Sequence, residues 1–171
     1  FSYDGEFNSP ASFYPNTLII SGFSNSAAIT GSRLRYAYGP ADLIKAMLNI
    51  QMYSFVCAPS FAQYAGLTAL DYDISTFSAK YKAKRDRIYQ GLKPYFNVVK
   101  PGGAFYIFPE APNGDGDAFV KKAIENNLLI VPGNAFSERN THFRISYAAS
   151  DDTIEKGIDI LVRMAKEYGV K

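Results

Sequence analysis

Short runs of apolar or alternating residues, which are typical of β-strands, are interspersed along this chain with longer segments of helical spacing. The predicted strands are residues 17–21, 33–38, 96–99, 104–108, 128–131 and 144–148. Apolar residues three and four positions apart, preceded by capping residues, predict helices. These helices begin near Pro40, Ser60, Ser75 or Thr76, Asp115 and Asp152. The order of strands and helices predicts an α/β fold.

On this pattern the chain divides into two parts. In the first part, Leu43, Met47 and Ile50 are spaced to place one face of a helix against a core, and residues 51–59 predict an irregular apolar connection. The second part is a denser alternation of strands and helices. We therefore predict two parts, which are residues 1–72 and residues 73–171.

Composition narrows the class of protein. The 171 residues are 47% apolar and carry a net charge of +2, which favours neither nucleic acid nor a membrane surface as a partner. No apolar stretch approaches the roughly 20 residues of a membrane span, and the N-terminus lacks the pattern of a signal peptide. The single cysteine, Cys57, excludes an internal disulfide, and no residues have metal-ligand spacing. We therefore expect a soluble, cytoplasmic protein without a metal site.

Aromatic residues are frequent, with 13 Tyr and 13 Phe but no Trp, and many of them fall in the first part of the chain. One interpretation is a well-filled core. The alternative is that some rings cover an interface with a second chain or with a missing segment.

Residues 22–38, with the sequence GFSNSAAITGSRLRYAY, contain the candidate chemistry. A short apolar strand leads into a polar turn of small residues, and Arg33 follows at the start of the next strand. The backbone amides of such a turn, together with a two-pronged and permanently charged guanidinium, form an anion pocket. The stretch therefore predicts an anion-binding site.

The same stretch resembles the cofactor-lysine segment of the class I and II pyridoxal-phosphate aminotransferases. The positions in register with that family's pattern are Gly22, Phe23, Ser24, Gly31, Arg33, Leu34 and Tyr36. Two positions depart: Asn25 stands where the family has the lysine, and Arg35 stands where it has a small residue. Arg35 either re-aims its strand or answers the charge lost at position 25. Three further segments are similar to family segments in the same order, namely residues 100–106, 131–136 and 143–148.

The resemblance implies the C-terminal part of a fold type I aminotransferase. Residues 1–72 correspond to a remnant of the large cofactor-binding domain, and residues 73–171 to the small C-terminal α/β domain. The implied activity is transfer of an amino group between an amino acid and a 2-oxo acid, with pyridoxal phosphate as cofactor. The implied partner is a second copy or a complementing N-terminal segment, because the family's Asp-x-x-Tyr, which contacts the cofactor ring, would precede residue 1.

The resemblance also assigns roles to individual residues. Ser24 and Arg33 correspond to contacts of the cofactor phosphate, and Arg144 corresponds to the arginine that holds the substrate α-carboxylate. Each assignment has an alternative: Ser24 closes the turn, Arg33 is buried and paired with a carboxylate, and Arg144 is a surface arginine on an edge strand. With the assigned roles, Arg33 and Arg144 are predicted to face one shared hollow.

Asn25 determines what the chain is expected to do. In the family, the lysine amine binds the cofactor as an imine and moves the proton during transamination. The amide nitrogen of Asn25 has its lone pair delocalised into the carbonyl, so it forms no imine and accepts no proton; its alternative role is to cap a helix. We therefore expect impaired catalysis, in a degenerate copy or in a form that retains cofactor without turnover. The alternative is a non-catalytic binding or dimerisation module.

Overall fold

The computed structural model describes residues 2–170, which divide into two compact units. Residues 5–76 form the N-terminal unit, and residues 2–4 together with residues 77–170 form the C-terminal unit. Phe1, the first residue of the first predicted part, and Lys171, the last residue of the second, lie outside the described residues. The assignment of a partial large domain and a small domain to these parts stays a prediction.

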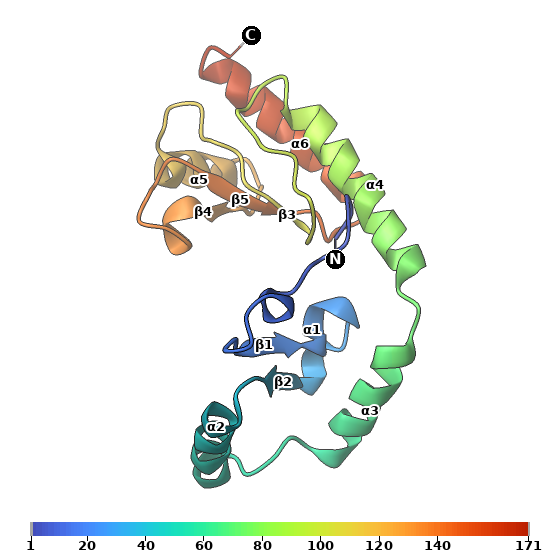
Figure 1. Ribbon diagram of the computed structural model, residues 1–171. Helices are drawn as coiled ribbons and strands as arrows, with labels where there is room; N and C mark the ends of the chain where they lie inside the picture. Colours follow the sequence, from blue (N-terminus) through green and yellow to red (C-terminus); the bar gives the residue numbers. More distant parts are fainter. Residues whose placement is uncertain (1, 171) are drawn as a thin grey trace. The chain divides into compact units, whose positions relative to one another are not determined.

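The N-terminal unit contains a two-stranded antiparallel sheet flanked by helices (Figure 1). Its elements are the 3-10 turns η1 (Pro10–Ser12) and η2 (Thr30–Ser32), the strands β1 (Ile19–Gly22) and β2 (Arg35–Tyr38), and the helices α1 (Phe23–Ser26), α2 (Ala41–Ser54) and α3 (Ser60–Asp71). The two strands predicted in this part of the chain are confirmed, with ends shifted by one or two residues.

The prediction that Leu43, Met47 and Ile50 face a core is wrong, because α2 has no buried residue. The helix also continues to Ser54, into the stretch predicted as an irregular connection. The predicted cap of α3 is wrong as well: Ser60 is the first helical residue and Pro59 precedes it as the cap. The spacing of apolar residues therefore predicted the helices correctly, but it did not predict whether their apolar faces are buried.

Most aromatic side chains of the N-terminal unit are exposed, so the prediction of a well-filled core is wrong for this part of the chain. Exposure reaches 89% for Tyr53 and 73% for Phe61, whereas Phe23 is buried. A two-stranded sheet and a one-turn helix offer too little surface to cover the apolar faces of α2 and α3.

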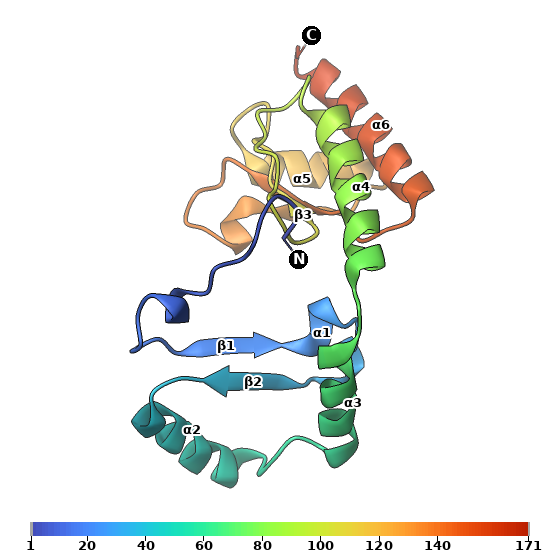
Figure 2. The same cartoon turned by 45° about the vertical axis from the view of Figure 1, so that its right-hand side comes forward.

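The C-terminal unit is a three-stranded antiparallel sheet with the strand order β3–β5–β4, packed against three helices. Its elements are α4 (Ser75–Leu92), β3 (Tyr106–Ile107), α5 (Gly116–Glu125), β4 (Val131–Pro132), the 3-10 turn η3 (Gly133–Ala135), β5 (Phe143–Ser146) and α6 (Asp151–Glu167). Figure 2 shows α4 and α6 side by side, as Figure 1 does from another direction.

A single apolar core holds the sheet of the C-terminal unit in place. The rings of Phe119 in α5 and Phe143 in β5 stack with their centroids 4.6 Å apart, and Phe96 meets Phe143 edge-on at 5.7 Å. Leu92 of α4 and Leu161 of α6 are buried in the same cluster. The central strand β5 is therefore fixed by packing as well as by hydrogen bonds on both of its edges.

Three details of this unit differ from the sequence predictions. The strand predicted at residues 128–131 is wrong for residues 128–130, because β4 begins only at Val131 and includes Pro132. Residues 96–99 form no strand, and β3 pairs with β5. The last helix begins at Asp151 with Ser150 as its cap, since the Thr153 amide donates to Ser150 Oγ at 3.3 Å. Asp115 is the cap of α5, as predicted, and accepts from the Ala118 amide at 3.1 Å.

A buried arginine ties residues 2–4 to the C-terminal unit. The Arg85 side chain is buried and pairs with the carboxylates of Asp4 and Asp86, while its guanidinium carbon lies 4.8 Å from the Tyr3 ring centroid. The Tyr3 amide donates to the Gly102 carbonyl at 2.8 Å. Hydrogen bonding from Arg85 lowers the pKa of the Asp4 carboxyl. Because this pKa is lowered on folding, the charged form of Asp4 stabilises the attachment.

None of the helices in the described part of the chain has the length and apolar character that crossing a membrane requires.

We expect acid to release residues 2–4 from the C-terminal unit. The stabilisation from Asp4 is complete above the ordinary carboxyl pKa of about 3.9 and is lost as the pH falls through the lower folded value. Protection of the Tyr3 amide in hydrogen exchange should therefore fall over this range, and D4N should already be poorly protected at pH 6. The control D159N changes an exposed carboxylate with no ion pair among residues 2–170 and should behave as the parent chain. Equal acid sensitivity in D4N and the parent would contradict the assignment to Asp4.

Candidate functional site

The hairpin of β1 and β2 positions the first group of candidate residues. Strand β1 ends at Gly22, and the single helical turn α1 follows at once, so that Ser24 and Asn25 lie directly beyond the strand. The Phe23 amide donates to the Leu34 carbonyl at 3.3 Å, which closes the end of the hairpin. The alternative role of Asn25 as a helix cap is wrong, because Gly22 is the cap residue of α1.

Packing against α3 holds this end of the hairpin. Phe23 and Leu34 are buried, and both lie against Gly66 of α3. A Cβ on Gly66 would lie 2.5 Å from Leu34 Cδ2, so any larger residue would displace the end of the Leu34 side chain. Apolar contacts with α3 therefore hold in place the turn that carries Ser24 and Asn25.

Ser24, Asn25 and Arg35 line one cavity of about 210 Å³, together with Ile20, Ser21 and Gly22. The register of the hairpin explains this grouping, because Gly22 lies directly opposite Arg35. A Cβ on Gly22 would lie 3.0 Å from Arg35 Cγ, so the absence of a side chain there leaves room for the arginine stem. Arg35 was predicted either to re-aim its strand or to replace the charge lost at position 25. This placement favours the second interpretation.

Arg33 is placed differently from the sequence expectation. It follows η2 in the left-handed region, with φ of 50°, and its side chain is exposed. The alternative of a buried arginine paired with a carboxylate is therefore wrong. Arg33 is not among the residues that line the cavity of Ser24 and Asn25, and its contact with a phosphate stays a prediction.

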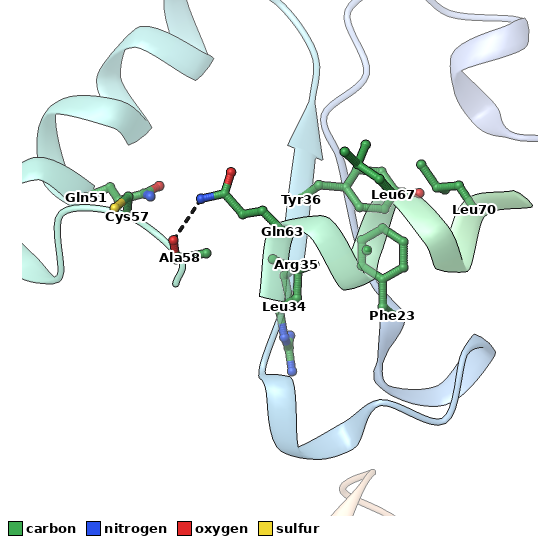
Figure 3. A pocket seen from close by; sticks show the side chains of 11 residues that line it. Phe23, Leu34, Arg35, Tyr36, Gln51, Cys57, Ala58, Gln63, Leu67 and Leu70 are labelled. Atoms are coloured by element: carbon green, nitrogen blue, oxygen red, sulfur yellow. Dashed lines mark hydrogen bonds between the residues drawn. The ribbon is translucent and has the colours of Figure 1, made fainter. Parts of the chain in front are cut away.

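A second cavity, of about 370 Å³, also has Arg35 in its lining and is mainly apolar (Figure 3). Phe23, Leu67 and Leu70 are among its lining residues, and the Arg35 guanidinium is directed away from the Phe23 ring. Gln63 Nε2 donates to the Ala58 carbonyl at 2.8 Å. Arg35 is thus the charged residue at the border of both cavities.

Arg144 occupies the central strand of the other sheet. It pairs with Val131 of β4, and β3 flanks the opposite edge of β5, so the alternative of an edge-strand surface arginine is wrong. The guanidinium carbon lies 4.3 Å from the Tyr106 ring centroid and 3.9 Å from that of Phe136. Within residues 2–170, the half-buried guanidinium makes no hydrogen bond or ion pair. Its N–H donors are therefore available to an anion.

Sequence reasoning missed Tyr106 and Phe136 as neighbours of Arg144. A signal was present, because both aromatic residues lie in segments that resemble the family, residues 100–106 and 131–136. What the sequence lacked was the strand order that brings those segments to either edge of β5.

The predicted residues fall in both units: Ser24, Asn25 and Arg33 in the N-terminal unit, and Arg144 in the C-terminal unit. The shared hollow of Arg33 and Arg144 accordingly stays a prediction. In residues 2–170, no three His, Cys, Asp or Glu side chains gather in a group that could hold a metal ion.

Comparison with known proteins gives consistent matches over most of the chain. The probable aspartate aminotransferase of Methanocaldococcus jannaschii is 43% identical over 170 residues, which cover 93% of this chain and 45% of that protein. The aspartate aminotransferase of Bacillus subtilis is 36% identical over 165 residues, which cover 89% of this chain and 42% of that protein. The chain therefore spans somewhat less than half the length of these curated relatives.

Solved structures agree with the sequence matches. The aspartate aminotransferase from Thermotoga maritima superimposes with a TM-score of 0.90 at 29% identity, over 96% of this chain and 45% of that one. A Methanococcus jannaschii protein, described as similar in its active site to kynurenine aminotransferases, gives a TM-score of 0.89 at 30% identity, over 96% of this chain and 47% of that one. The predicted fold, part of a fold type I aminotransferase, is confirmed.

The family described as aminotransferase class I and II matches residues 7–161, which is most of the sequence. With the shared fold and the similar sequences, this match establishes that the chain belongs to the class I and II aminotransferases.

Proposed function

We propose that this chain supplies the lysine segment and the carboxylate-binding arginine of a pyridoxal-phosphate aminotransferase, and that it binds cofactor without completing amino transfer. The family's reaction moves an amino group between an amino acid and a 2-oxo acid. The observation that carries the proposal is the single cavity lined by Ser24, Asn25 and Arg35. This cavity offers donors to an anion at the position where the family has its lysine.

The donor set fits the phosphate group of the cofactor. A serine hydroxyl donates one hydrogen bond, and a guanidinium offers a fixed fork that matches phosphate oxygens. Ser24 and Arg35 supply these groups at the cavity, and Arg33 supplies a second guanidinium from the end of η2. When bound, pyridoxal phosphate supplies the electron sink of the reaction.

Position 25 does not fit covalent attachment of the same cofactor. The Asn25 amide has no basic nitrogen, and a guanidinium such as that of Arg35 has donors but no acceptor site, so neither side chain takes up a proton from substrate. The Ser24 hydroxyl is a weak base without a histidine or lysine beside it among the lining residues. These three side chains therefore hold and orient an anion, and no proton transfer is assigned to them.

A second candidate function is a non-catalytic binding or dimerisation module. The observation that favours it is the uncovered apolar face of the N-terminal unit, where α2 has no buried residue. Large exposed side chains on α2 and α3 are typical of surfaces that another protein covers. On this alternative the occupant is a second copy of the chain, which sedimentation over a range of concentrations would detect.

Restoring an amine at position 25 tests whether the chain retains a binding site for pyridoxal phosphate there. In N25K, pyridoxal phosphate should attach covalently at position 25, because an amine replaces the amide beside the anion donors. Visible absorbance and peptide mass after borohydride reduction measure the attachment. The matched control N25Q keeps an amide and should give no adduct at position 25. Failure of N25K to attach, with no reversible binding to the parent chain, would contradict cofactor binding by this chain and favour either the module or a site that further protein completes.

Removing one guanidinium tests the phosphate contact. R33Q should weaken binding of pyridoxal phosphate by about tenfold or more, since a hydrogen bond to a charged group contributes about 1.5–3 kcal/mol. Binding of pyridoxal, which lacks the phosphate, should not change. Equilibrium dialysis measures both ligands, and R139Q, an exposed arginine of the C-terminal unit, is the control. If R35Q weakens binding while R33Q does not, the phosphate contact belongs to Arg35.

A further inference from the structure

We infer that Tyr106 and Phe136 are positioning residues that hold the Arg144 guanidinium as a receptor for one carboxylate group. This inference rests on the proposed role of Arg144 and adds the two side chains that orient it. The guanidinium carbon lies over both rings, 4.3 Å from the Tyr106 centroid and 3.9 Å from the Phe136 centroid.

Strand pairing brings Tyr106 to Arg144. Tyr106 lies directly opposite Ser146, and Ser146 and Arg144 are two residues apart, so they project from the same face of β5. Tyr106 is therefore the diagonal neighbour of Arg144, a separation that an aromatic ring and a long side chain bridge.

The backbone after β4 brings Phe136 to the same place. Val131 pairs with Arg144, and η3 begins two residues later at Gly133. The Gly133 amide donates to the His142 carbonyl at 2.7 Å, and the Phe136 amide donates to the Gly133 carbonyl at 2.9 Å. Phe136 is thus anchored by hydrogen bonds on a short turn, although half of its surface is exposed.

Contact with two ring faces has a specific consequence for a guanidinium. Each ring attracts the cation and restricts the rotation of its stem, but a ring face accepts none of the in-plane N–H hydrogen bonds that a carboxylate takes. A carboxylate has two oxygens at the spacing of the guanidinium fork. Arg144 therefore meets its ligand already oriented, so less conformational entropy is lost on binding.

The arrangement agrees with the carboxylate ligand already proposed for Arg144. No carboxylate within residues 2–170 pairs with Arg144, so the donors are not used by an internal ion pair. Two aromatic walls with a planar, bidentate donor suit a small planar anion attached to an organic group. A carboxylic acid has this chemistry.

The test uses the full chain and NMR of the arginine Nε–Hε groups, with propionate as the probe. Loss of one signal in R144Q assigns the Arg144 resonance. In the parent chain this resonance should show a ring-current shift and should move saturably on addition of propionate. Propionamide, which has the same shape without the charge, should not move it.

Variants of the rings then separate positioning from charge. F136L and Y106L should each remove part of the ring-current shift and weaken propionate binding by roughly two- to tenfold. F136Y and Y106F keep a ring at each position and should retain both properties. Because Phe136 is half-exposed, F136L is expected to leave the fold intact, which the remaining spectrum reports.

The outcomes distinguish this inference from the proposed function. If F136L and Y106L bind propionate as the parent does while R144Q does not, the positioning role is overturned and the carboxylate role of Arg144 stands. If no propionate-dependent shift occurs at Arg144 in any of these proteins, the carboxylate role itself fails, and the inference fails with it.

Discussion

Antiparallel pairing of short strands determines where Arg35 and Arg144 lie. In the N-terminal unit, the register that sets Gly22 opposite Arg35 places a guanidinium beside Ser24 and Asn25. In the C-terminal unit, pairing on both edges of β5 places an aromatic ring from each side near Arg144. A slip of one residue in either register would turn these side chains to the opposite face, so the candidate chemistry depends on register.

Much of the fold was predictable from local pattern, and the failures have physical causes. The strand around Arg144 and the helix capped by Asp115 follow from alternation and capping, which are local properties. Phe96 is buried without belonging to a strand, because an apolar side chain can reach a core from irregular backbone. The neighbours of Arg144 were not predictable, since they depend on a strand order that no local pattern encodes.

The exposed apolar faces of α2 and α3 bear on both candidate functions. Their spacing is that of helices with a covered side, yet within the described residues these faces are open. The chain spans about 45% of the length of its Methanocaldococcus jannaschii relative. The two proposed functions differ in which protein would cover these helix faces. An aminotransferase requires further protein to complete the cofactor site, whereas a module uses the surface to bind a second copy.

Of the three candidate anion-binding arginines, Arg35 and Arg144 differ in how strongly their surroundings restrict them. Arg35 is exposed and its stem passes over Gly22, so several orientations of its guanidinium are open and the residue acts mainly through charge. Arg144 is half-buried over two rings, so its fork has a defined direction and can select a planar ligand. A cofactor phosphate, which tolerates rotation about its ester bond, needs only the first kind of contact. A substrate carboxylate, whose orientation sets which bond is presented for reaction, needs the second.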